Sequence, residues 1–213
     1  MTDLAGLAAG GAHFAADASV SAIADFIAGM LAGEKPRAIA VPGGSTPAPI
    51  LAELAAREDV AWGLIAVWLT DDRIVPHDHP ASNFDLIERS LARTGAALVP
   101  LEQGATPPPF DLVWLGMGAD GHIASLFPNT DPGSDAPLGV QRLTPDPLPP
   151  EAPFDRLTLT IPALVRARHI MLVLKGNDKK AVLDAAIAGS NDLPIARLLR
   201  AAQVPVTIFW SAS

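Results

Sequence analysis

Asp111-Leu-Val-Trp-Leu-Gly-Met-Gly-Ala-Asp-Gly-His-Ile-Ala-Ser-Leu-Phe-Pro128 carries the strongest structural signal in this chain of 213 residues. Its apolar run at 112–115 predicts a buried strand, which breaks into glycines at 116, 118 and 121. His122 follows, and the apolar residues after it predict the start of a helix. Glycine lets a ligand approach the backbone closely, and ligands of open α/β sheets bind at the carboxyl edge of the strands. We therefore expect His122 at that edge.

The rest of the chain alternates between strand-like and helix-like patterns. Short apolar or alternating runs predict further strands at 37–41, 62–69, 156–161, 170–174 and 204–210. Helical spacing of apolar residues predicts helices at 17–32, 47–57, 85–91, 162–168 and 195–201, and a further helix that follows the charged stretch 175–180 and runs through Ile187. Strands that alternate with helices predict an α/β fold with a mostly parallel sheet and helices on both faces.

Length and composition set limits on the class of protein. We expect residues 1–213 to form a single domain, with a long Pro-rich surface loop at about 129–153. The net charge of −8 argues against nucleic-acid binding, which relies on Lys and Arg. Residues 1–11 hold no Lys or Arg, and no apolar run approaches the ~20 residues of a membrane span. We expect a cytoplasmic monomer that does not bind membranes.

A glycine turn follows the first predicted strand. Gly43-Gly-Ser-Thr46 offers backbone N–H groups, two hydroxyls and a helix start, which together suit a phosphate group. It is neither a nucleotide-binding P-loop nor the Gly-x-Ser-x-Gly turn of a serine nucleophile, because Pro47 stands where the second glycine would be. An ordinary tight turn between strand and helix is the competing interpretation.

Charged residues follow two further predicted strands. Asp71-Asp72-Arg73 brings two carboxylates and a guanidinium to a strand end, where Arg73 could bind an anion or simply form a surface ion pair. Lys175, Lys179 and Lys180 would reach the same edge of a parallel sheet, unless they form a solvated charge run. His77-Asp78-His79 lacks the remaining spacing of a known metal signature, so we expect no metal there.

His122 is the candidate catalytic group. It is flanked by Asp120 and glycines rather than by an apolar helical face, which favours a functional histidine over a buried structural one. A general base needs a near-neutral pKa and an orienting partner, and either Asp120 or Asp72 could be that partner. His13 and His169 are better explained as structural or solvated residues.

Taken together, these motifs resemble the 6-phosphogluconolactonase family, which is related to the glucosamine-6-phosphate deaminases. The matching segments are 43–47, 72–76 with Ser82-Asn83, 115–128, 156–160, and Gly176 with Lys179. The residues after His122 read Ala-Ser-Leu-Phe-Pro, as in the lactonases, whereas the deaminases carry Ala-Phe-Asn-Glu-Pro. Asp72 stands where the lactonases usually have Glu. The resemblance implies a Rossmann-like α/β fold and neither a metal nor an organic cofactor.

The resemblance also implies a reaction. It is the hydrolysis of 6-phospho-D-glucono-1,5-lactone, a phosphorylated sugar lactone, in the second step of the oxidative pentose phosphate pathway. The implied catalytic residues are His122, Asp120 and Arg73, with Arg73 serving either the oxyanion or the phosphate. The implied substrate-binding residues are Gly43, Gly44, Ser45, Thr46, Asp72 and Lys179. The alternatives are a glucosamine-6-phosphate deaminase/isomerase and a sugar-phosphate-binding protein without catalysis.

Overall fold

The structure, a computed structural model, describes residues 11–150 and 152–212. Residues 1–10, 151 and 213 of the predicted single domain lie outside the described residues, and so does all but the last residue of the 1–11 segment that holds no Lys or Arg. The elements are β1 (Ala12–Phe14), α1 (Val20–Leu31), β2 (Arg37–Val41), α2 (Pro47–Ala55), η2 (Trp62–Leu64), β3 (Ile65–Leu69), β4 (Asp71–Arg73), α3 (Asn83–Leu91), β5 (Ala97–Val99), β6 (Leu112–Leu115), η3 (Pro128–Thr130), β7 (Val140–Leu143), β8 (Arg156–Leu159), α4 (Ile161–Val165), β9 (Ile170–Lys175), α5 (Asn177–Ile187), α6 (Pro194–Ala201) and β10 (Val206–Ser211).

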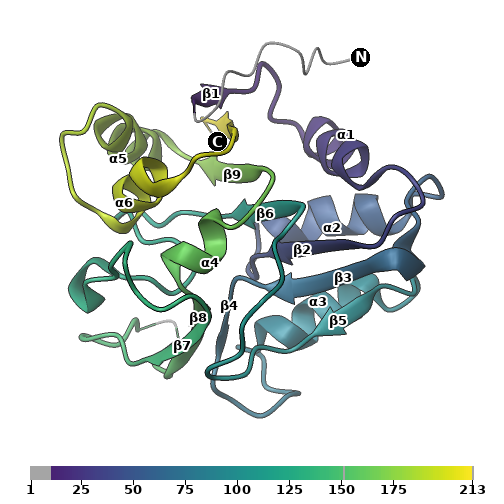
Figure 1. Cartoon of the computed structure of the whole chain (residues 1–213), viewed down its shortest axis with the longest axis horizontal. Coiled ribbons are helices and arrows are strands. Elements are labelled where there is room, and N and C mark those ends of the chain that lie inside the picture. Colours follow the sequence, from purple (N-terminus) through teal and green to yellow (C-terminus); the bar gives the residue numbers. More distant parts are fainter. Residues whose placement is uncertain (1–10, 151, 213) are drawn as a thin grey trace.

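Seven parallel strands form the main sheet, in the order β1-β10-β9-β6-β2-β3-β5 (Figure 1). From β2 the chain adds β3 and β5 on one side, whereas from β6 it adds β9 and β10 on the other. The order therefore reverses between β2 and β6. In open α/β sheets this reversal leaves a crevice at the carboxyl ends of the two strands, where ligands bind.

Helices cover both faces of the main sheet, which confirms the predicted α/β architecture. Side chains alternate between faces along a strand. In β6, Leu112 and Trp114 pack into one hydrophobic cluster with α1, α2 and α3. Val113 and Leu115 pack into a second cluster with α4, α5 and α6. A strand that is apolar on both faces, as 112–115 is, is shielded from water only where helices cover both faces of the sheet.

A second, antiparallel sheet of β4, β8 and β7 was not predicted. β4 holds Asp71-Asp72-Arg73, which the sequence placed only at the end of a strand, and β7 lies within residues 129–153, where a loop was expected. The helix expected directly after His122 is wrong, because residues 123–126 form a tight turn closed by an Ile123–Leu126 bridge. Leu126 and Ile123 are instead buried in the core, which explains why the segment is apolar.

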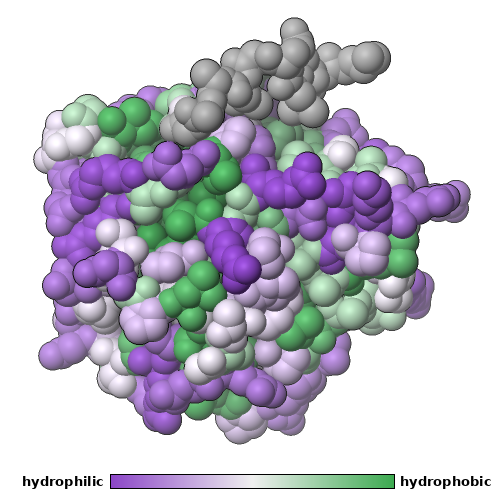
Figure 2. All heavy atoms as spheres, viewed as in Figure 1, coloured by the Kyte–Doolittle hydropathy of each residue, from purple (hydrophilic) through white to green (hydrophobic). Residues whose placement is uncertain are grey.

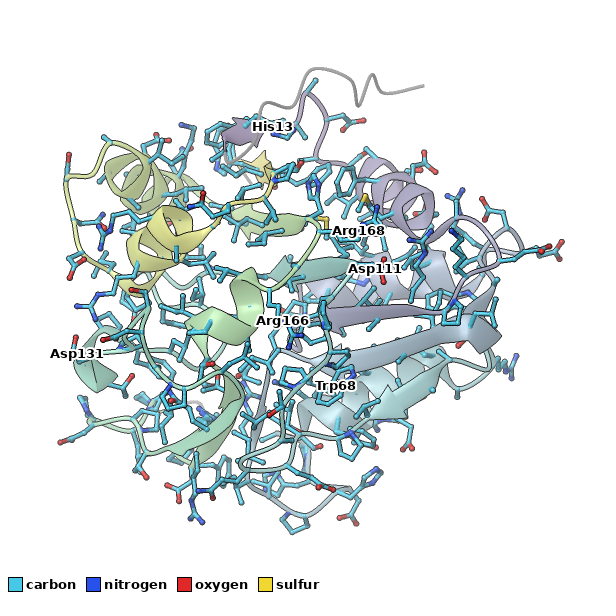
Figure 3. The ribbon with its side chains drawn as sticks, in the orientation of Figure 1. His13, Trp68, Asp111, Asp131, Arg166 and Arg168 are labelled. Atoms are coloured by element: carbon cyan, nitrogen blue, oxygen red, sulfur yellow. The ribbon has the colours of Figure 1, made fainter. Side chains whose placement is uncertain are left out.

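On the face shown in Figure 2, hydrophobic and hydrophilic residues alternate in small groups. Among the described residues, no helix is long and apolar enough to cross a membrane. An ion pair joins the first part of the 129–153 segment to α6. Asp131, labelled in Figure 3, pairs with Arg197 of α6 at 2.5 Å, and Arg197 also binds Asp192.

Candidate active site

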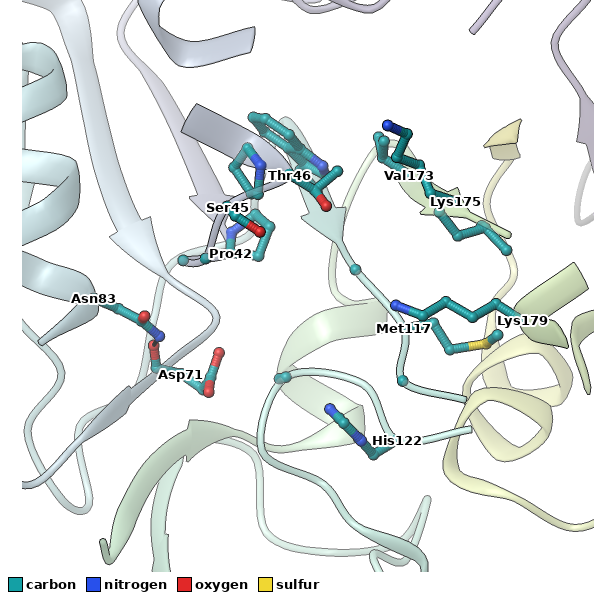
Figure 4. A pocket seen from close by; sticks show the side chains of 18 of the residues that line it. Pro42, Ser45, Thr46, Asp71, Asn83, Met117, His122, Val173, Lys175 and Lys179 are labelled. Atoms are coloured by element: carbon teal, nitrogen blue, oxygen red, sulfur yellow. Dashed lines mark hydrogen bonds between the residues drawn. The ribbon is translucent and has the colours of Figure 1, made fainter. Parts of the chain in front are cut away.

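A cavity of about 300 Å³ opens at the carboxyl edge, where β2 and β6 meet. The turns after these strands, the end of β9, the start of α5 and the strand β4 all contribute to its wall. In Figure 4, the side chains of Ser45, Thr46, Lys179 and His122 converge on the same space. The lining residues are Pro42, Gly43, Gly44, Ser45, Thr46, Pro47, Asp71, Arg73, Asn83, Trp114, Gly116, Met117, Gly118, His122, Ala124, Val173, Leu174, Lys175 and Lys179.

The glycine turn at 43–46 has the shape that anion binding needs. Gly44 adopts φ +101°, a conformation that other residues rarely take. A Cβ on Gly43 would lie 2.0 Å from Oδ1 of Asn83, so only glycine fits there. Thr46 precedes α2, and its side chain makes no capping hydrogen bond to the helix. Pro47 and Pro49 carry no N–H, so the first turn of α2 offers only the N–H groups of Ala48 and Ile50. The N–H groups of the 43–46 turn and the hydroxyls of Ser45 and Thr46 therefore supply most of the donors that could bind an anion in the cavity.

His122 and Asp120 form a hydrogen-bonded pair. Nδ1 of His122 lies 2.6 Å from Oδ1 of Asp120, which also accepts the backbone N–H of His122 at 3.2 Å. The ring of Phe127 packs against the imidazole with 4.7 Å between ring centroids. Because the carboxylate accepts the proton on Nδ1, Nε2 remains an acceptor that can take a proton from water. His122 lines the cavity, whereas Asp120 lies outside the lining and contacts the imidazole.

The strand β4 separates the two carboxylates that the sequence places side by side. Asp71 and Arg73 line the cavity, and Asp72 does not. The carboxylate of Asp72 accepts the backbone N–H groups of Arg73 and Asn83 at 2.7 Å and of Phe84 at 3.1 Å, so it caps α3. Burial raises the pKa of Asp72, and these hydrogen bonds oppose that shift. Residues i and i+2 of a strand lie on the same face. A prediction of β4 would therefore have placed Asp71 on the side of Arg73, and Asp72 on the other side.

Sequence reasoning missed two residues that hold this part of the wall. Asn83, considered only as a helix cap and family match, accepts a hydrogen bond from Nη1 of Arg73 at 3.1 Å and donates to the carbonyl of Asp71. Ser125 donates its hydroxyl to Oδ2 of Asp71 at 2.6 Å. Asn83 and Ser125 are almost fully buried, at 3% and 2% exposure. A polar residue within an apolar segment indicates a buried hydrogen bond, and this was the sequence feature that could have identified Ser125.

The three lysines do not act together. Lys175, at the end of β9, and Lys179, in the first turn of α5, line the cavity. Lys180 pairs with Asp184 at 2.6 Å and lies over the ring of Phe14 at 5.0 Å. Two of the three lysines thus line the cavity, and Lys179 is the one whose side chain extends toward His122 in Figure 4.

The two histidines of the 77–79 segment contact different groups in the structure. His77 lies 3.2 Å from Glu88, and Nδ1 of His79 accepts the N–H of Ala81. His77, Asp85 and Glu88 come close enough together to share a cation, but none of them lines the cavity. The prediction that the site uses no metal stays a prediction.

Comparisons with known proteins agree on one family. The model of the glucosamine-6-phosphate isomerases/6-phosphogluconolactonase family matches residues 12–106 and 95–210. The chain belongs to this family. A 6-phosphogluconolactonase of Pseudomonas aeruginosa is 36% identical to it, over 88% of this chain and 87% of the relative. One of Mesorhizobium japonicum is 35% identical, over 89% and 87%. The crystal structure of a 6-phosphogluconolactonase from Shewanella baltica matches with a TM-score of 0.78 at 29% identity, covering 95% of this chain and 98% of that one.

In this member of the lactonase and isomerase family, the residues after His122 have defined structural tasks. Ser125 fixes Asp71 in the cavity wall, and Phe127 packs against the imidazole. The turn that carries them also joins the main sheet to the second sheet, because the N–H of Ser125 binds Oγ1 of Thr158 in β8 at 3.2 Å. The family motif therefore positions both the candidate base and the opposite wall of the cavity.

Proposed function

We propose that this protein is a 6-phosphogluconolactonase, which hydrolyses 6-phospho-D-glucono-1,5-lactone to 6-phospho-D-gluconate in the oxidative pentose phosphate pathway. The observation that carries the proposal is the imidazole of His122, oriented by Asp120, in one cavity with Lys175, Lys179 and the anion-binding turn at 43–46. The lactonase relatives at 35% and 36% identity support it.

His122 acts as the general base in the proposed reaction. Nε2 takes a proton from water while the water oxygen attacks the C1 carbonyl of the lactone. The tetrahedral oxyanion then collapses, the bond from C1 to the ring oxygen breaks, and the imidazolium returns the proton to that oxygen. Asp120 keeps the proton on Nδ1 and stabilises the imidazolium, as the carboxylate of a catalytic triad does. No covalent intermediate is required.

The cationic groups of the cavity bind the anionic parts of the substrate. Lys179 and the N–H groups of the 43–46 turn bind the 6-phosphate, with Lys175 close by. Arg73 supplies a further positive charge from β4, for the phosphate or for the oxyanion. Asp72 supports this arrangement by capping α3 and does not contact the substrate. The monomeric state and the cytoplasmic location stay predictions.

The test is the activity of a His122→Ala variant. The lactone is generated in place from the sugar phosphate, and a control without enzyme corrects for spontaneous hydrolysis. We expect kcat to fall by about 10²-fold or more, the usual contribution of a general base, with 6-phosphogluconate binding retained. Wild-type activity in this variant would refute the assignment. Ammonia release from glucosamine 6-phosphate would instead favour the deaminase, and binding of 6-phosphogluconate without turnover in the wild type would favour a sensor.

A further inference from the structure

A second arginine lies next to Arg73 in the second sheet. Arg156 of β8 is directly opposite Arg73 in the antiparallel pair with β4, and Thr158 is opposite Asp71. Residues that face each other in such a pair project from the same side of the sheet. Arg156 therefore extends from the cavity-facing side, although it does not itself line the cavity and is only 3% exposed.

The guanidinium of Arg156 is poorly satisfied. Nη2 donates to the carbonyl of Ala152 at 2.7 Å, whereas Nε and Nη1 are buried and meet no acceptor among the described residues. Burial lowers the pKa of Arg156, and the charge of Arg73 lowers it further; Asp71 and Asp72 oppose both effects. A buried cation with unused donors destabilises a fold, so its presence calls for a reason other than stability.

Arg73 is held by neutral acceptors. Its Nη1 donates to the carbonyl of Ala81 at 2.8 Å and to Oδ1 of Asn83 at 3.1 Å, and within the described chain it forms no ion pair. Yet Asp71 and Asp72 precede it directly on β4. Without Arg156, these two carboxylates would outweigh the charge of Arg73 at a wall that faces an anionic substrate. With Arg156, the four charges of the group balance.

We propose that Arg156 is a positioning residue, whose charge offsets Asp71 and Asp72 so that the guanidinium of Arg73 stays available to the anionic substrate. The proposal rests on the proposed function for the identity of that substrate, a phosphorylated sugar. Arg156 contacts no substrate atom. It acts on the affinity of the site for anions, and hence on KM more than on kcat.

The test compares Arg156→Met, which removes the charge but keeps a long side chain, with Arg156→Lys, which keeps the charge. We expect Met to raise KM for the lactone and the inhibition constant of inorganic phosphate by about tenfold each, on the order of 1.4 kcal/mol. kcat should change less than about twofold, and Lys should restore most of the affinity. The melting temperature of Arg156→Met should fall and that of Arg156→Lys should fall less, because removing one charge of a buried group leaves Asp71 and Asp72 uncompensated.

Arg37→Met is the matched control. Arg37 is partly buried at the start of β2, at the opposite edge of the sheet, where it pairs with Asp111 at 3.0 Å. We expect it to lower the melting temperature and leave the phosphate inhibition constant unchanged. If Arg156→Met fails to fold, Arg156→Gln takes its place in the comparison with Lys.

Unchanged phosphate affinity in the folded, uncharged variant would overturn the proposal, as would an equal loss in Arg156→Lys. Failure of the proposed function has a different signature. Wild-type protein that binds 6-phosphogluconate without hydrolysing the lactone would refute the lactonase assignment. The ratio of phosphate affinities between Arg156→Met and Arg156→Lys would still decide the role of Arg156.

Discussion

Replacing Gly118 by Ala should disable the candidate base without unfolding the protein. A Cβ at this position would lie 2.3 Å from Cε1 and Nδ1 of His122 and 2.6 Å from Oδ1 of Asp120. Such atoms need about 3.4 Å, so the ring or the carboxylate must move by about 1 Å. Both side chains are partly exposed, at 32% and 51%, and can swing into solvent. The hydrogen bond that orients the imidazole is then lost.

The size of the effect follows from this displacement. Moving a catalytic group by 1 Å costs roughly 10²-fold in rate, so we expect kcat of Gly118→Ala to fall by about that factor. The anion-binding turn and the lysines are untouched, and the inhibition constant of phosphate should stay within about twofold. Because the side chains relax outward, the free energy of unfolding should change by less than about 1 kcal/mol. Steady-state lactonase kinetics and urea denaturation measure both quantities.

Gly116→Ala is the comparison, because a Cβ there meets no atom within 4 Å. It lines the same cavity, so any effect should appear in KM and leave kcat unchanged. A folded Gly118→Ala protein with the kcat of the wild type would show that the His122–Asp120 geometry is not what drives catalysis.

Two further predictions concern stability. Asp72→Ala removes the acceptor of two backbone N–H groups at the start of α3 and of the N–H of Arg73 in β4. The change should lower the free energy of unfolding by about 1–3 kcal/mol, while kcat/KM of the folded protein stays within about threefold. A selective loss of substrate affinity would contradict the capping role. Burial and, to a smaller extent, the charge of His13 lower the pKa of His169 to about 4. Below pH 6.5 the unfolded chain therefore takes up a proton on this histidine that the folded state does not bind until the pH approaches 4. Stability is then fully present above pH 6.5 and should decline by roughly 2–3 kcal/mol as the pH falls to 4. Urea denaturation at pH 7 and 4.5 measures the decline, and an unchanged decline in His169→Gln would exclude this origin.

Much of the main sheet could be predicted from local patterns. The run at 112–115 is apolar at every position, which only a strand covered on both faces can satisfy, and the run at 37–41 ends in a glycine turn. The position of His122 at the sheet edge followed from the same reasoning, since a parallel strand delivers whatever comes next to its carboxyl end. The helix predicted after His122 failed because Ile-Ala-Ser-Leu at 123–126, three apolar residues and a serine, suits the first turn of a helix as well as a tight turn.

The sequence by itself determined the fold class and the chemical groups that reach the cavity, because strand periodicity and glycine turns are properties of neighbouring residues. Only the tertiary structure decided which of two adjacent carboxylates faces the cavity. That choice depends on β4 pairing with β8, a segment more than 80 residues away, and such pairing leaves almost no local signal in three residues. The same pairing brings Arg156 beside Arg73, a proximity set by the register of the second sheet.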